Sequence, residues 1–127
     1  AMNLADYSVF SYLYRDASNY KAWNDLLLVG HLTEEEMMLM RRKLESGEFF
    51  IAEQLRIPTL YEALWESCRC DGPTGRDHVW HEFHEIRAAT PEDLRTLDLW
   101  GEAKELAKRI SDVVSWNEKL SNNWSLL

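Results

Sequence analysis

The first part of the chain alternates apolar and polar side chains with the period of a β-strand. Residues 7–16 (YSVFSYLYRD) are rich in aromatic and branched side chains. Residues 22–32 (AWNDLLLVGHL) form a second run, apolar on both faces near its middle. The segment between the two runs contains Ser and Asn, which satisfy backbone groups locally in turns. The pattern therefore predicts an antiparallel hairpin.

Three later segments begin with the signature of a helix N-terminus. In each, a threonine stands three positions before an acid, the spacing at which the two side chains satisfy each other's backbone amides. The pairs are Thr33 with Glu36, Thr59 with Glu62, and Thr90 with Asp93. They predict helices over residues 33–47, 58–67 and 90–97, the first of which ends at Gly47 in the left-handed conformation.

Residues 99–120 place apolar side chains at alternating spacings of three and four. This period predicts one amphipathic helix of about six turns at 3.6 residues each. Asn117 falls on the apolar stripe, and a polar residue in such a seam can set the register of a helical dimer. The stripe has two interpretations: packing on the protein's own sheet, and the seam of a homodimer.

Residues 77–89 contain DHVWHEFHEI, whose Val, Trp, Phe and Ile favour a third strand. In a regular strand, one side carries Trp80, Glu82, His84 and Ile86, and the other Val79, His81, Phe83 and Glu85. Neither side is purely apolar, so we expect this strand at a sheet edge or along a cleft. Residues 48–55 favour a short further strand.

These elements predict an α+β fold in a single domain, residues 1–127. We expect a small antiparallel sheet of three or four strands that starts with the N-terminal hairpin. Helices pack on one face of the sheet, and a long helix lies at the C-terminus. Residues 1–6 and 121–127 are expected to be disordered tails, and Gly and Pro in residues 70–77 indicate a surface loop.

Composition restricts the function. The net charge is −8, and there is no block of five Lys or Arg, so direct nucleic-acid binding is not expected. The chain has no run of 18 apolar residues and no signal-peptide pattern in its first ten, so we expect no membrane span. Its two cysteines, Cys68 and Cys70, form no disulfide framework. These features predict a reduced, cytoplasmic protein.

Cys68, Cys70, His78 and His81 supply four residue types that bind zinc. Their pattern, C-x-C-x7-H-x2-H, has a tighter cysteine pair than the usual C-x2–4-C of structural zinc sites. The zinc hypothesis therefore needs the loop between the two pairs to bring them together. The alternative is that no cofactor is bound and the histidines are ordinary polar residues.

His81, Glu82 and His84 are candidates for acid/base catalysis. Glu82 and His84 share one side of the predicted strand, where a carboxylate can orient an imidazole. The alternative is a half-exposed strand whose polar side chains face solvent.

The tip of the predicted hairpin is a second polar concentration. It contains Arg15, Asp16, Asn19, Tyr20 and Lys21. Two cations beside an aromatic side chain can bind an anionic ligand or a partner. The alternative is a turn whose charges satisfy one another.

Three segments resemble short bacterial proteins that have no assigned activity. The segments are SYLYRDASNYKAW, LESGEFFIAEQLRIP and DHVWHEFHEIR, so the resemblance covers about residues 10–90. It implies a small stand-alone bacterial protein and assigns no functional residue.

We therefore predict a small acidic protein that acts by protein–protein interaction rather than as an enzyme. An inhibitor or adaptor that binds a basic partner surface would have this character, and a homodimer through residues 99–120 is a further expectation. The competing hypothesis is a metal-dependent or acid/base enzyme that uses the His, Cys and Glu side chains of residues 68–85.

Overall fold

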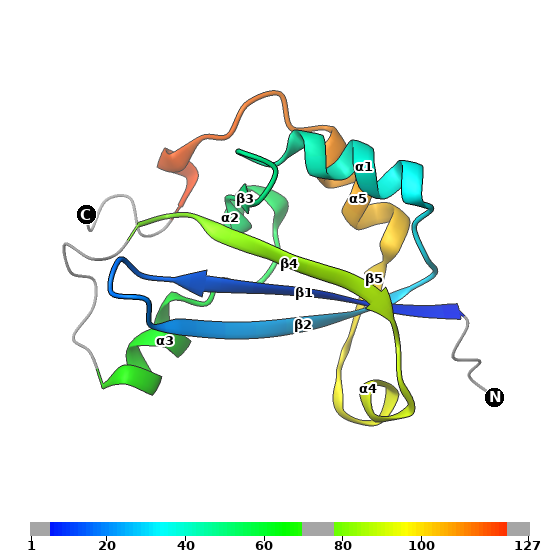
Figure 1. Ribbon diagram of the computed structural model, residues 1–127, viewed down its shortest axis with the longest axis horizontal. Coiled ribbons are helices and arrows are strands. Elements are labelled where there is room, and N and C mark those ends of the chain that lie inside the picture. The colour runs from blue at the N-terminus through cyan, green and yellow to red at the C-terminus, as the bar shows by residue number, and fades with distance from the viewer. Residues whose placement is uncertain (1–5, 70–77, 122–127) are drawn as a thin grey trace.

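The structure is a computed structural model that describes residues 6–69 and 78–121 (Figure 1). Its centre is a five-stranded mixed sheet in the order β3-β4-β1-β2-β5. The strands are β1 (Tyr7–Arg15), β2 (Lys21–Val29), β3 (Phe49–Phe50), β4 (His81–Ala88) and β5 (Leu99–Glu102). The helices are α1 (Glu34–Lys43), α2 (Ala52–Leu55), α3 (Tyr61–Cys68), α4 (Pro91–Thr96), α5 (Ala103–Ser111) and a short 3₁₀ helix, η2 (Glu118–Leu120).

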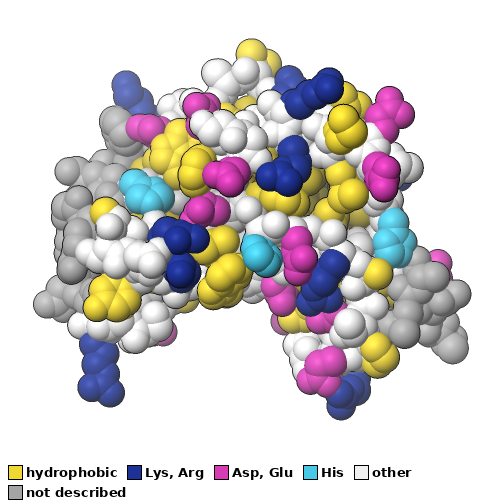
Figure 2. Space-filling model, viewed as in Figure 1, with side chains coloured by type: hydrophobic (Ala, Val, Ile, Leu, Met, Phe, Trp, Pro, Cys, Tyr) yellow, Lys and Arg dark blue, Asp and Glu magenta, His cyan; other side chains and the backbone are white. Residues whose placement is uncertain are grey.

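The α+β class is confirmed, and so is the N-terminal hairpin of β1 and β2. The sheet differs from the prediction in size and direction, because β5 adds a fifth strand that runs parallel to β2. β5 pairs only with residues 27–29 of β2, so the first part of that strand has no outer neighbour among the described residues. In Figure 2 the surface is hollowed between the parts of the molecule that contain α3 and α4.

The central strand β1 is buried on both faces. On one face Tyr12 and Tyr14 belong to the main core, which the sheet forms with α1, α2, α3 and α5. On the other face Val9 packs with Leu27, and α4 with the residues around it covers this smaller cluster. Helices therefore lie on both faces of the sheet, whereas the sequence predicted one face.

The prediction of a long C-terminal helix over residues 99–120 is wrong. Residues 99–102 form β5, α5 has nine residues, and η2 follows separately. The strand forms because these residues pair with β2, a non-local interaction that overrides the helical period. The apolar stripe of α5, with Leu106 and Ile110, is fully buried in the protein's own core, so the structure offers no exposed seam there.

Two of the three predicted capping boxes are confirmed, those of Thr33 with Glu36 and Thr90 with Asp93. The third is wrong, because α3 begins after Leu60 and has no side-chain cap from Thr59. The backbone N–H of Leu60 instead donates to the His81 imidazole Nε2 at 3.0 Å.

A β-bulge changes the predicted faces of β4. Tyr12 of β1 pairs with Phe83, but the next pair joins Ser11 to Glu85, so His84 is an extra residue. Phe83 and Ile86 consequently both pack against the main core, and the strict alternation predicted from the sequence is wrong here.

The predicted tails and loop lie mostly outside the described residues, which exclude 1–5, 70–77 and 122–127. Asp6 and Ser121, at the margins of the predicted tails, are described: the Asp6 carbonyl accepts the Gly30 N–H, and Ser121 is buried. Within the described part of the chain, no helix combines the length and the apolar character that crossing a bilayer requires.

Candidate functional site

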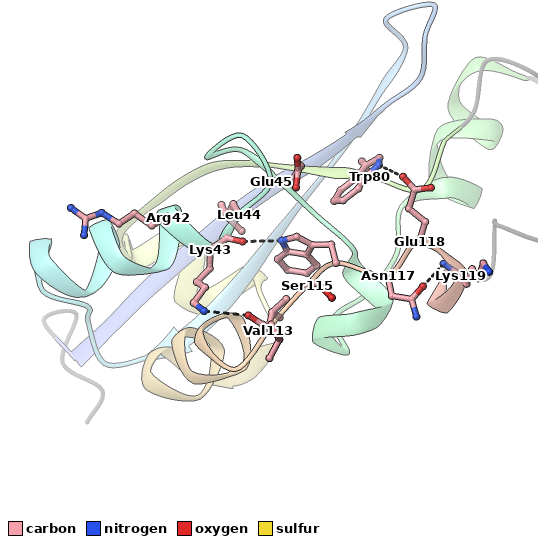
Figure 3. A pocket seen from close by; sticks show the side chains of 12 residues that line it. Arg42, Lys43, Leu44, Glu45, Trp80, Val113, Ser115, Asn117, Glu118 and Lys119 are labelled. Atoms are coloured by element: carbon pink, nitrogen blue, oxygen red, sulfur yellow. Dashed lines mark hydrogen bonds between the residues drawn. The ribbon is translucent and has the colours of Figure 1, made fainter.

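A cavity of about 940 Å³ lies between the end of α1 and the segment 113–119 (Figure 3). The Trp116 indole Nε1 donates to the Lys43 carbonyl oxygen at 2.8 Å. The Lys43 Nζ in turn donates to the Val113 carbonyl oxygen at 3.3 Å. These two bonds attach the segment to α1. No local pattern in the sequence predicts this cavity, because the residues that these bonds join are 70 or more positions apart.

His81, a predicted acid/base residue and zinc ligand, is fully buried among aromatic rings. The ring centroids of Tyr61, Tyr14, Phe50 and Tyr12 lie 5.0, 5.3, 6.0 and 6.1 Å from the imidazole centroid. The rings come from β1, β3 and α3, so this histidine is where those elements meet.

The hydrogen bond to His81 determines which ring nitrogen carries the proton, and burial determines the charge of the ring. Nε2 accepts the Leu60 N–H, so a neutral ring carries its proton on Nδ1, which has no partner among the described residues. Burial, with a smaller electrostatic contribution from His78, lowers the pKa of His81 from 6.5 to about 3. The imidazole is therefore neutral and enclosed at neutral pH, with no access to a substrate.

The predicted zinc ligands form no site in the part of the chain that is described, where no three Cys, His, Asp or Glu side chains are grouped to hold a metal. Cys68 is disulfide-bonded, contrary to the expectation of reduced thiols, and Cys70 lies outside the described residues. Both ring nitrogens of His78 contact backbone groups, a carbonyl oxygen at 2.6 Å and an N–H at 3.0 Å.

Residues of β1, β2 and β4 that are far apart in the sequence meet in two contacts on the sheet face opposite α5. Arg15 of β1 and Glu82 of β4 form an ion pair, with 2.9 Å between Nε and Oε2. The His84 ring packs edge-on against Trp23 of β2, with centroids 5.0 Å apart. Trp23 is 53% exposed. We call these four residues the open face; Trp23 was not predicted as part of a site, because an aromatic residue in a strand is ordinarily explained by packing.

The remaining hairpin candidates mainly build the turn. The Asp16 carboxylate accepts two backbone N–H groups of the turn, at 2.9 and 3.0 Å. Asn19 adopts a positive φ of 69°, and its Oδ1 accepts from Arg15 at 2.7 Å. Tyr20 and Lys21 are exposed. Because Arg15 is held by Glu82 and Asn19, the turn alternative accounts for this cluster better than an anion site.

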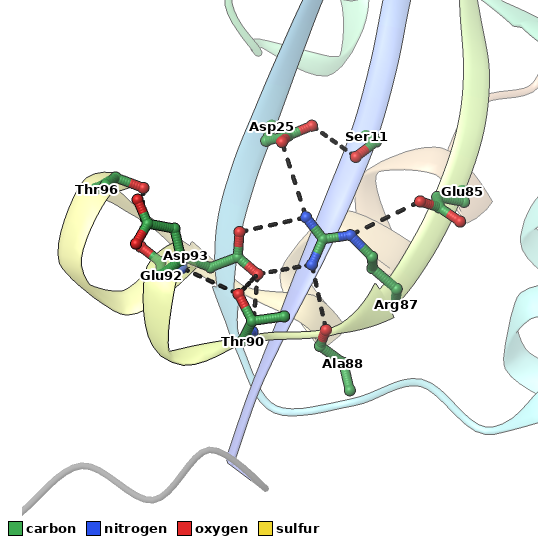
Figure 4. Close-up of polar contacts among 9 residues, drawn as sticks. All are labelled: Ser11, Asp25, Glu85, Arg87, Ala88, Thr90, Glu92, Asp93 and Thr96. Atoms are coloured by element: carbon green, nitrogen blue, oxygen red, sulfur yellow. Dashed lines mark hydrogen bonds and ion pairs between the residues drawn. The ribbon is translucent and has the colours of Figure 1, made fainter.

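Beyond the open face, an ion-pair network attaches α4 to the sheet (Figure 4). The Arg87 guanidinium donates to both carboxylate oxygens of Asp93, at 2.6 and 3.2 Å. Asp93 also accepts the Thr90 N–H at 2.8 Å. The hydrogen bond from Arg87 is the main cause that lowers the pKa of Asp93 to about 2. Asp25 and Glu85 lie 3.9 and 3.7 Å from the same guanidinium.

A groove of about 420 Å³ runs between α1 and β4, and most of its surface is apolar; we call it the α1–β4 groove. Its lining consists of Glu34, Met37, Met38 and Arg41 from α1 and of residues 83–86 from β4. Met38 is 58% exposed, and the Arg41 guanidinium carbon lies 5.0 Å from the Phe83 ring centroid. The groove thus presents apolar surface beside a strand.

The outer edge of β4 beside this groove has no strand partner among the described residues after Phe83, whose N–H donates to the Glu48 carbonyl. Peptide groups alternate in direction along an antiparallel strand. The Ala89 N–H points inward, because it donates to Tyr7 of β1. By this alternation Ile86 directs its N–H and C=O outward, where neither group has a strand partner in the described part of the chain.

Comparison with known proteins identifies no relative of this chain. No protein-family model matches it, no curated protein matches it, and no solved structure matches it. The resemblance to short bacterial proteins therefore stays a prediction.

The buried imidazole predicts an acid-sensitive stability. The unfolded chain protonates His81 near its ordinary pKa of 6.5, whereas the folded protein does so only near 3. Because the unfolded state binds more protons in this window, the free energy of unfolding should fall with decreasing pH, by up to about 1.4 kcal/mol per unit. Denaturant unfolding of wild type and His81→Gln at several pH values tests this. Gln keeps an acceptor for Leu60 but does not titrate, so equal slopes in both proteins would contradict the prediction.

The Asp93 network predicts a second stability effect. Asp93→Asn should lower the free energy of unfolding at neutral pH by about 2 kcal/mol, because it weakens a charged hydrogen-bond pair and a capping box. The lowered pKa means that the contribution is present above the unfolded pKa and is lost as the pH falls toward about 2. Urea unfolding at neutral and acidic pH measures it. Glu92→Gln, an exposed acid of the same first turn, is the control and should change stability by less than about 0.5 kcal/mol.

Proposed function

We propose that this protein binds an extended segment of a partner protein along the outer edge of β4. The observation that carries the proposal is the unpaired edge of β4 beside the apolar α1–β4 groove. A segment that pairs with a strand edge gains affinity from main-chain hydrogen bonds, and its alternate side chains give specificity by entering pockets.

The groove determines what the partner's side chains meet. Successive side chains of an added strand point to opposite faces of the sheet. On the α1 side they would contact the apolar surface of Met37, Met38 and Phe83. On the opposite side they would pass His84 and Glu85, both exposed. The proposed segment therefore has apolar side chains at every second position.

Charge favours basic residues between those apolar positions. The chain carries a net charge of −8, and Glu85, one of the two carboxylates that line the α1–β4 groove, lies on the side opposite α1, to which those residues would point. The one guanidinium in the groove lining, that of Arg41, is directed at the Phe83 ring. Complementary charge speeds association and selects partners. The proposal thus keeps the expectation of a basic partner, and either an inhibitor or an adaptor would act in this way.

The enzyme hypothesis for residues 68–85 finds less support in the geometry. His81 is enclosed and neutral at neutral pH, and Glu82 is paired with Arg15. His84 is exposed but packs against Trp23 rather than against a carboxylate. We therefore propose a binding function for this protein.

Selection from a display library of random twelve-residue segments tests the proposal. We expect selected segments to alternate apolar and basic residues. Their affinity should fall at least about tenfold on Ile86→Pro, which removes the outward N–H of the edge, and on Met38→Glu, which places a charge in the groove. Calorimetric titration of a synthetic segment measures both effects, and methylation of alternate peptide nitrogens in the segment should also abolish binding.

Two matched variants keep the test interpretable. Ile86→Val alters the same side chain but retains the N–H, so it should bind nearly as wild type does. Val114→Asp introduces a charge at a fully exposed apolar position outside the groove and should have no effect. Segments that bind Ile86→Pro and Met38→Glu as tightly as wild type would overturn the proposal.

A further inference from the structure

We propose that a second cavity, distinct from the α1–β4 groove, binds a small alkylammonium cation. We call it the ring cavity; it is lined by Glu45, Phe49, His78, Trp80 and Glu118. Its volume of about 480 Å³ lies within the range of small-molecule sites. It adjoins the larger cavity beside α1, with which it shares Trp80 and the two carboxylates.

The rings of the cavity have their polar edges engaged within the protein. The Trp80 indole Nε1 donates to Glu118 Oε1 at 3.0 Å. The His78 Nδ1 accepts the Trp80 N–H at 3.0 Å, and its Nε2 lies 2.6 Å from the Arg15 carbonyl oxygen, to which it donates. What these side chains offer a ligand is therefore the aromatic face rather than a hydrogen-bonding edge. Such a face attracts a cation through its quadrupole.

A tight turn holds one wall of the ring cavity in place. The Glu45 N–H donates to the Phe49 carbonyl at 2.8 Å, and the Phe49 N–H donates to the Glu45 carbonyl at 2.9 Å. Between them Ser46 and Gly47 both adopt positive φ angles, 55° and 74°. The carboxylate and the phenyl ring are thus carried by a backbone that is already closed by hydrogen bonds before a ligand binds.

The charge of the lining selects the sign of the ligand. Two carboxylates and no Lys or Arg line the ring cavity among the described residues. In Figure 3 the Trp80 indole lies between Glu45 and Glu118. Aromatic faces with carboxylates suit an organic cation, whose alkyl groups pack on the rings while its diffuse charge is balanced. A hydrated metal ion would gain little here, since no group of three metal-ligating side chains is present in the described chain.

Titration with choline against its neutral isostere, 3,3-dimethylbutan-1-ol, tests the inference. The two molecules have the same shape and differ in charge. We expect choline and tetramethylammonium to shift the Trp80 indole N–H resonance saturably, and the isostere to bind at least about tenfold more weakly. Equal affinity for the isostere, or no saturable shift with either cation at millimolar concentration, would overturn the inference. So would binding to phosphatidylcholine vesicles without binding of free choline.

Variants locate the site. Glu45→Gln should weaken choline binding about threefold, since it removes one exposed charge. Glu48→Gln, an exposed acid in the same turn but outside the cavity lining, should leave the affinity unchanged. Trp80→Ala should abolish the binding measured by calorimetry, while Trp23→Ala, on the open face, should retain it. Equal losses in the two glutamate variants would show that net charge rather than this cavity attracts the cation, and would refute the site.

Discussion

The hydrogen bond from the Leu60 N–H to His81 Nε2 joins the parts of this protein that carry its surfaces. It connects Leu60, the residue immediately before α3, to the beginning of β4. The bond lies inside a cluster of aromatic rings from β1, β3 and α3. The bond requires a neutral imidazole, and burial supplies that neutrality. A polar side chain thus joins α3 to the sheet inside a largely apolar core. Pairing with β1 and β3 places β4 in the sheet, and this contact holds its first residue against the start of α3.

Local signals in the sequence predicted much of the fold. The hairpin of β1 and β2 and the capping boxes at Thr33 and Thr90 depend on neighbouring residues, and all three are present. The helix predicted over residues 99–120 was wrong because the start of that segment pairs with β2, about 70 positions earlier. The box at Thr59 was wrong because Leu60, not Thr59, occupies the N-cap position of α3, and the Leu60 N–H donates to a histidine of β4.

Three of the four open-face residues were predicted individually, but Trp23 and the arrangement of the four were not. Arg15, Glu82 and His84 were all identified from polar clusters, yet only the pairing of β1 with β4 brings the first two together. The bulge at His84 could not be read from an alternating pattern, since one extra residue reverses every later side chain. His81 resembled a solvent-exposed strand residue, and its burial depends on rings from three other elements. The α1–β4 groove joins segments about 40 positions apart and leaves no signal in either one.

The shortness of β3 has a consequence for how such a protein can diversify. β3 contains only two residues, so it covers the beginning of β4 and stops. Each pair of residues added to it would hydrogen-bond to one more outward-facing position of β4 and close that part of the edge. The length of the connection between α1 and α2 therefore sets how much of the edge a partner can reach. Insertions and deletions there would alter the proposed recognition and leave the aromatic core around His81 in place.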